Sequence, residues 1–190
     1  MKLLKITLLI FLISFTVQLD AQDTIQQDPN LGSRQVDKVS IGIGAGLDFG
    51  GFGGNVIYYP IKNVGIFGGV GYALAGAGYN VGIKYRYIPD KPTSKIDAYG
   101  MIMYGYNAAI AVLNANQYNK LFFGPTLGIG IDFHRKPMNK GYWSFALLIP
   151  IRSSAVNEYM DDLENNHGAE FQNRLFPVGI SVGYKFIIHK

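Results

Sequence analysis

Between Val39 and Ile188, large apolar side chains alternate with glycine or polar residues about eight times, and turns interrupt the alternation. In the first stretch, Ile41, Ile43 and Leu47 share one phase, and glycines fill most of the other. Because successive side chains of a strand point to opposite faces, a period of two indicates β-strands with two unlike faces. The pattern predicts an all-β chain that forms an eight-stranded antiparallel up-and-down transmembrane barrel.

The predicted strands are joined by short connections and one long one. They cover Val39–Gly50, Asn55–Tyr59, Val64–Ala75, Tyr79–Ile88, Ile96–Val112, Leu121–Phe133, Tyr142–Arg152 and Phe176–Ile188. With the amino terminus in the periplasm, the outward connections are Gly51–Gly54, Gly76–Gly78, Leu113–Lys120 and Ser153–Leu175. Long loops on one side of the membrane are typical of such barrels.

The amino-terminal residues predict export from the cytoplasm. Residues 1–21 combine an early lysine pair, an apolar run and a small residue at Ala21, as a signal peptide does. Residues 22–37 are polar, contain Pro29 and Gly32 and lack periodicity, which predicts a flexible periplasmic leader. Residues 38–190 then form one barrel domain.

The two phases of the strands differ too much in bulk for the apolar one to face inward. An eight-stranded barrel has an interior that side chains only just fill, and the apolar phase is rich in Val, Ile, Leu, Phe and Tyr. The other phase, mostly glycine and small polar residues, has too few charges for a soluble surface. We therefore expect the bulky phase to face lipid and the small phase to line a filled lumen.

Charged and aromatic residues support this assignment of faces. The inward phase contains six charged residues, and buried charges need partners, which predicts a network joining Arg86 and Lys185 to Asp97 and Asp132. The six are Asp48, Lys84, Arg86, Asp97, Asp132 and Lys185.

Aromatic residues gather at two levels, as interfacial girdles require. The outer level is Phe49, Tyr72, Tyr79, Tyr106 and Phe123, and the inner level is Tyr58, Tyr85, Tyr87, Phe133, Trp143, Tyr184 and Phe186.

Three segments resemble the small outer-membrane β-barrels of Gram-negative bacteria, of the kind represented by the OmpA transmembrane domain, OmpX and OmpW, and the similar barrels of Bacteroidetes-type bacteria. They are the signal ending Leu19-Asp20-Ala21-Gln22, the turn Tyr59-Pro60-Ile61-Lys62-Asn63 leading into Val64–Tyr72, and the closing strand Val178–Phe186. The resemblance covers roughly Lys38 to Ile188. It implies a porin-like cell-envelope protein of the bacterial outer membrane, inserted by the outer-membrane assembly machinery, which reads a terminal strand that usually ends in an aromatic residue. Here Phe186 is followed by four further residues.

The sequence carries no catalytic, cofactor or metal motif that we accept. The glycine-rich runs lack a following Gly-Lys-Ser/Thr, and the three histidines, His134, His167 and His189, have no metal-binding spacing. The mild net charge does not indicate nucleic acid. A rim hydrolase or acyltransferase is a competing hypothesis, because some barrels of this class carry serine and histidine near the outer rim. Its candidate residues are Ser153, Ser154, Asp161, Asp162 and His167.

The long loop 153–175 offers two further interpretations. Val156, Tyr159, Met160 and Leu163 have helical spacing and predict a short amphipathic helix at the barrel mouth, with acidic residues around it. Lys120, Arg152 and Arg174 flank the rim and are candidates to bind lipopolysaccharide phosphates.

The leading hypothesis is a non-enzymatic barrel that supports the envelope or presents the loop 153–175 to an extracellular partner. A narrow solute or ion conduit and a soluble ligand carrier are two competing hypotheses.

Overall fold

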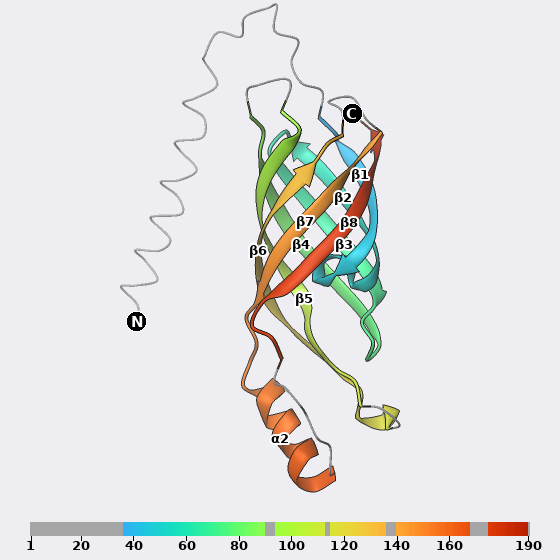
Figure 1. Cartoon of the computed structure of the whole chain (residues 1–190), viewed down its shortest axis with the longest axis vertical. Helices are drawn as coiled ribbons and strands as arrows, with labels where there is room; N and C mark the ends of the chain where they lie inside the picture. The colour runs from blue at the N-terminus through green and yellow to red at the C-terminus, as the bar shows by residue number, and fades with distance from the viewer. Residues whose placement is uncertain (1–35, 90–93, 113–114, 136–139, 168–174, 190) are drawn as a thin grey trace, which may run out of the picture. The chain divides into compact units, whose positions relative to one another are not determined.

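The computed structural model describes residues 36–89, 94–112, 115–135, 140–167 and 175–189. The predicted signal peptide and most of the predicted leader lie outside the described residues. Eight strands form a closed barrel in chain order, with each strand antiparallel to its neighbours and β8 paired with β1 (Figure 1). The strands are β1 (Val39–Gly46), β2 (Gly51–Ile61), β3 (Val64–Tyr72), β4 (Ala77–Tyr87), β5 (Ile96–Ile110), β6 (Lys120–Phe133), β7 (Gly141–Pro150) and β8 (Gly179–His189). The predicted all-β antiparallel barrel is confirmed.

The two faces of the barrel are those that the alternation predicts. Ile41, Ile83, Leu127 and Ile180 point outward, with 43% to 71% of their surface exposed. The six charged residues of the other phase are all buried, together with a cluster of large side chains that includes Ile57, Tyr59, Tyr99, Met101 and Met103. The core of the protein is therefore the barrel lumen.

The connection between β1 and β2 differs from the prediction. The alternation predicts a first strand that continues to Gly50 and a turn at Gly51–Gly54, but β1 ends at Gly46 and a 3-10 turn, η1 (Leu47–Phe49), follows. Gly50 and Gly51 have φ values of 74° and 105°, which side-chain-bearing residues rarely adopt. These two glycines let the chain reverse at once into β2, which begins four residues earlier than predicted.

The other strand ends lie within three residues of their predicted positions, apart from a bulge in β5. Tyr106 pairs with Phe123 and Ala108 with Phe122, so Asn107 is the extra residue of a β-bulge. The bulge leaves Tyr106, Asn107 and Ala108 all buried. Tyr106 is therefore absent from the outer aromatic girdle because of the bulge, and Phe49 is absent because it lies in η1; the prediction was wrong for both residues. Tyr72, Tyr79, Phe123 and most of the inner girdle are exposed as predicted.

The predicted amphipathic helix is present as α2 (Ala155–His167). Its buried residues Val156, Met160 and Leu163 pack against Ala108 and Ile110, on the part of the β5–β6 hairpin that extends beyond the other strands (Figure 1). Tyr159 adds a hydrogen bond to the backbone oxygen of Tyr118, near the turn η2 (Asn116–Tyr118). The helix therefore rests on the extended hairpin through the face that the sequence predicted. Among the described residues, no helix is both long and apolar enough to cross a membrane.

Candidate functional site

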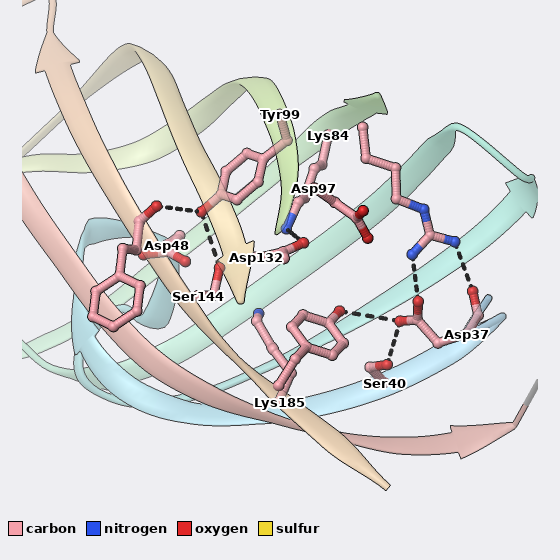
Figure 2. Close-up of polar contacts among 12 residues, drawn as sticks. Asp37, Ser40, Asp48, Lys84, Asp97, Tyr99, Asp132, Ser144 and Lys185 are labelled. Atoms are coloured by element: carbon pink, nitrogen blue, oxygen red, sulfur yellow. Dashed lines mark hydrogen bonds and ion pairs between the residues drawn. The ribbon is translucent and has the colours of Figure 1, made fainter. Parts of the chain in front are cut away.

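The lumen contains a set of buried ion pairs at the end of the barrel where β1 begins. Arg86 on β4 forms an ion pair with Asp37, just before β1, and donates a second hydrogen bond to the Asp37 backbone oxygen at 2.8 Å (Figure 2). Its Nε donates to the backbone oxygen of Lys62 at 2.9 Å, and its guanidinium lies 3.4 Å from the centre of the Tyr59 ring. Arg86 thereby links β4 to the segment before β1 and to the turn after β2.

Asp37 is a partner that the sequence pattern did not predict. Ser40 Oγ and Tyr142 Oη also donate hydrogen bonds to its carboxylate, the latter at 3.0 Å. Asp37 is the last residue of the predicted leader, and its side chain is buried. Arg86 was predicted to join Asp97 and Asp132, but its ion pair is with Asp37. The alternation identifies inward residues only within strands, so it gave no signal for a carboxylate that enters the lumen from the preceding segment. The proximity of Asp37 to the first strand was the available clue.

Two further acidic residues lie directly opposite each other in the pairing of β5 with β6. Asp97 and Asp132 are cross-strand neighbours, which would repel if both were ionised and unpaired. Each has its own cationic or imidazole partner: Lys84 Nζ lies 2.7 Å from Asp132 Oδ2, and His134 Nε2 lies 3.1 Å from Asp97 Oδ2. Lys84 also lies 3.5 Å from the centre of the Tyr99 ring. The predicted network thus exists, but with different partners.

Lys185 on β8 is held by an amide in place of the carboxylates that were predicted. Gly42 of β1 pairs with Asn55 on one side and with Lys185 on the other. Because Gly42 has no side chain, Lys185 reaches across it and donates to Asn55 Oδ1. A Cβ at Gly42 would lie 2.6 Å from both side chains, so this contact requires glycine. The Lys185 ammonium also lies 4.8 Å from the centre of the Phe49 ring.

The turn η1 fills the lumen towards the opposite end. Phe49 is fully buried, and its ring is among the nearest neighbours of Gly44 and Gly183. Asn80 Nδ2 donates to the Leu47 backbone oxygen at 2.8 Å, and Ser181 Oγ donates to Asp48. The large side chains nearest to the inward glycines belong to adjacent strands, as with Tyr59 over Gly65, or to this inserted turn.

The space left between the charged groups is small. A cavity of about 10 Å³ lies among nine side chains that include Asp48, Lys84, Tyr99 and Lys185. That volume holds about one water molecule. The groups around it can exchange hydrogen bonds with a water, but the packed side chains oppose the passage of a solute.

The ion pair of Asp37 predicts a specific dependence of stability on pH. Burial raises the pKa of Asp37, but the charge of Arg86 and the hydrogen bonds from Ser40, Arg86 and Tyr142 outweigh burial and hold the pKa below its usual 3.8. A carboxyl group with a lowered folded-state pKa stabilises the fold above pH 3.8, and the contribution disappears as pH falls through the folded-state value. We expect the urea midpoint of the wild type to fall more steeply than that of Asp37→Asn below about pH 4. If the urea midpoints of the two proteins fell equally with pH, the stabilising role of the Asp37 ion pair would be contradicted.

Of the catalytic candidates in the outer loop, the structure describes the side chains of Ser153, Ser154, Asp161 and Asp162. Ser153 and Ser154 are exposed before α2, and Asn166 donates a hydrogen bond to Asp162 Oδ1 at 2.7 Å. The His167 side chain and Arg174 lie outside the described residues. Within the described ranges, no group of three histidine or acidic residues is placed to hold a metal ion.

The two described basic residues of the rim make contacts within the protein. Arg152 donates to backbone oxygens of Asn107 and Phe176, at 3.2 Å and 2.6 Å, and burial lowers its pKa. Lys120 lies 4.4 Å from the centre of the Tyr159 ring. Both side chains help to anchor the loop and α2 on the barrel.

Comparison with known proteins finds similarity to a solved β-barrel domain. No protein-family model matches the chain, and no curated protein matches it. The crystal structure of the N-terminal β-barrel domain of Pseudomonas aeruginosa OprF is similar, with a TM-score of 0.44 and 12% sequence identity. The similarity covers 80% of this chain and 100% of that domain.

Proposed function

We propose that the chain is an integral barrel of the bacterial outer membrane, with a filled lumen and a structural or surface-interaction role. One observation carries this proposal: large apolar side chains are exposed on all eight strands, while the six charged residues of the inward phase are buried. Soluble monomers rarely expose contiguous apolar patches above about 300–600 Å². A belt around the whole barrel instead suits a hydrocarbon environment, where closure leaves no unpaired strand edge.

The aromatic residues and the chain ends support an orientation. Exposed Tyr85, Tyr87 and Trp143 lie towards the end of the barrel where β1 begins, and Tyr72, Tyr79 and Phe123 lie towards the end with α2. Amphipathic rings favour both membrane interfaces. We place the end where β1 begins, with Asp37 and His189, in the periplasm. The β5–β6 extension and α2 then face outward, towards lipopolysaccharide.

In the proposed surface-interaction role, α2 is the element that contacts an extracellular partner. Its apolar face is already occupied by Ala108 and Ile110, and the opposite face exposes polar residues such as Glu158 and Asp162. A helix docked on a rigid hairpin presents those side chains in a fixed arrangement. Insertion by the outer-membrane assembly machinery is part of the same proposal, with Phe186 as the terminal aromatic residue of β8.

A pair of isoleucine substitutions tests membrane residence. Ile102 lies mid-strand between Ile83 and Leu127, and Ile61 lies at the end of β2; 55% and 64% of their surfaces are exposed. In a bilayer, Ile102→Arg is expected to cost about 2–4 kcal/mol of folding free energy, and Ile61→Arg about 0–1 kcal/mol. Urea titration of folding into phospholipid vesicles measures both. In a soluble barrel both exposed changes would be nearly neutral, which would refute the proposal.

A further inference from the structure

An apolar groove of about 620 Å³ crosses the outer face of the barrel from β4 to β8. Its lining follows the lateral pairing of the strands, so that the groove runs across them. One row is Tyr85, Gly100, Ile129, Leu147 and Ile180, each paired with the next. The neighbouring row contains Tyr87, Ala98, Ile131 and Phe145. The volume is in the range of pockets that bind small molecules.

The groove exists because β5 has short side chains on its outer face at this level. Gly100 lies between Tyr85 and Ile129, and Ala98 lies between Tyr87 and Ile131. A Cβ added at Gly100 would have the Gly128 backbone oxygen, at 3.9 Å, as its only neighbour within 4 Å. Open space therefore lies above Gly100, between two rows of longer side chains.

A second hollow, of about 440 Å³, lies on the next row of pairs towards the end of the barrel where β1 begins. Phe133, Trp143 and Tyr184 form this row, and Arg135 also lines the hollow. The Trp143 and Tyr184 rings meet edge to face at 5.3 Å. Arg135 is exposed just beyond the end of β6. An arginine beside amphipathic rings at the edge of an apolar groove suits an anionic headgroup that is attached to a hydrocarbon chain.

We propose that the groove and the hollow together bind one anionic phospholipid, with an acyl chain across Gly100 and the phosphate beside Arg135. Along β6, the four residue steps from Phe133, which lines the hollow with Arg135, to Ile129, which pairs with Gly100, span about 13 Å. One leaflet of a hydrocarbon core is about 15 Å thick, so an oblique acyl chain fits this length. The inference rests on the proposed membrane residence, and the orientation given above places the site in the periplasmic, phospholipid leaflet.

The single tryptophan of the chain provides the measurement, because Trp143 lines the hollow. The full chain is inserted into phosphatidylcholine vesicles that contain brominated phosphatidylglycerol or, separately, brominated phosphatidylcholine. Bromine on the acyl chain quenches nearby tryptophan fluorescence. We expect the anionic lipid to bind roughly fivefold more strongly, the ratio that one basic side chain provides near an anionic surface. Equal quenching by the two lipids would overturn the proposal.

Matched variants separate the two parts of the site. Arg135→Gln is expected to abolish the preference for the anionic lipid, whereas Lys62→Gln, at another exposed position of the same rim, retains it. Gly100→Leu is expected to fill the groove and to weaken quenching by the anionic lipid. Gly68→Leu is the control, since this partly exposed glycine on β3 has its nearest neighbours at 3.8 Å and lies outside the groove.

The outcomes distinguish this inference from the proposed function. A chain that fails to insert into the vesicles at all contradicts membrane residence. A chain that inserts, but whose preference survives Arg135→Gln or falls equally in both glycine variants, contradicts the lipid site alone. Displacement of the brominated lipid by inorganic phosphate would show that the acyl chain adds nothing, and would also refute it.

Discussion

Replacing Arg86 by leucine is expected to lower the free energy of unfolding by about 3–5 kcal/mol, the cost of leaving one member of a buried ion pair without its partner. The variant removes the ion pair with Asp37, the hydrogen bond to the Lys62 backbone oxygen and the contact with the Tyr59 ring. Among the described residues, Arg86 is the cation that forms an ion pair with Asp37, so the carboxylate, 3% exposed, loses much of the compensation for its burial. Urea unfolding of the protein in vesicles measures the loss.

Two variants control for the charge and for the position. The double variant Asp37→Leu/Arg86→Leu removes both charges, so we expect it to be more stable than Arg86→Leu alone. Lys95→Leu removes an exposed lysine near the same end, and its effect on unfolding is expected within about 0.5 kcal/mol. A double variant that is less stable than Arg86→Leu would show that Asp37 is not destabilised by losing its partner.

Replacing Phe49 by alanine is expected to destabilise the barrel by about 3–5 kcal/mol, because a fully buried ring is lost from a packed core. The ring lies against Gly44 and Gly183, whose missing side chains make room for it. Its loss leaves a cavity beside Lys185, within the part of the lumen that η1 occupies. Urea unfolding reports the energy, and conductance across planar bilayers reports whether the lumen remains closed.

Phe52→Ala is the matched control for Phe49→Ala. Phe52 lies three residues further along the chain, on β2, with 66% of its surface exposed on the outer face. Removing it creates no cavity in the lumen, so we expect a smaller loss of stability and no conductance. We expect the wild type to show no sustained conductance either. Sustained wild-type conductance would support a solute or ion conduit and contradict a lumen filled by η1.

The alternation of side chains was sufficient to predict the barrel and the direction of nearly every strand residue. Ile41, Ile83, Leu127 and Ile180 lie outside, and Lys84, Asp132 and Lys185 lie inside, as their phase predicts. The reason is local: the backbone of a strand alternates its side chains regardless of what the strand pairs with. Val156, Met160 and Leu163 likewise predicted the buried face of α2 through their spacing.

The phase rule did not hold where the chain departs from regular strands. Tyr106 and Phe49 were both predicted in the aromatic girdle. The bulge at Asn107 turned Tyr106 inward, and the turn η1 placed Phe49 in the lumen. Each case involves a residue whose direction depends on one inserted position or on a pair of left-handed glycines. Periodicity alone contains no information about such positions.

The amino-acid sequence by itself determined that eight strands close into a ring with charges inside and apolar residues outside. Only the tertiary structure decided which partner each buried charged side chain meets: Arg86 contacts Asp37, Lys84 contacts Asp132, Asp97 contacts His134, and Lys185 contacts the amide of Asn55. Which face a residue occupies follows from the backbone of its own strand. Which partner it meets depends on the lateral register between strands and on the inward path of segments such as η1 and the residues before β1.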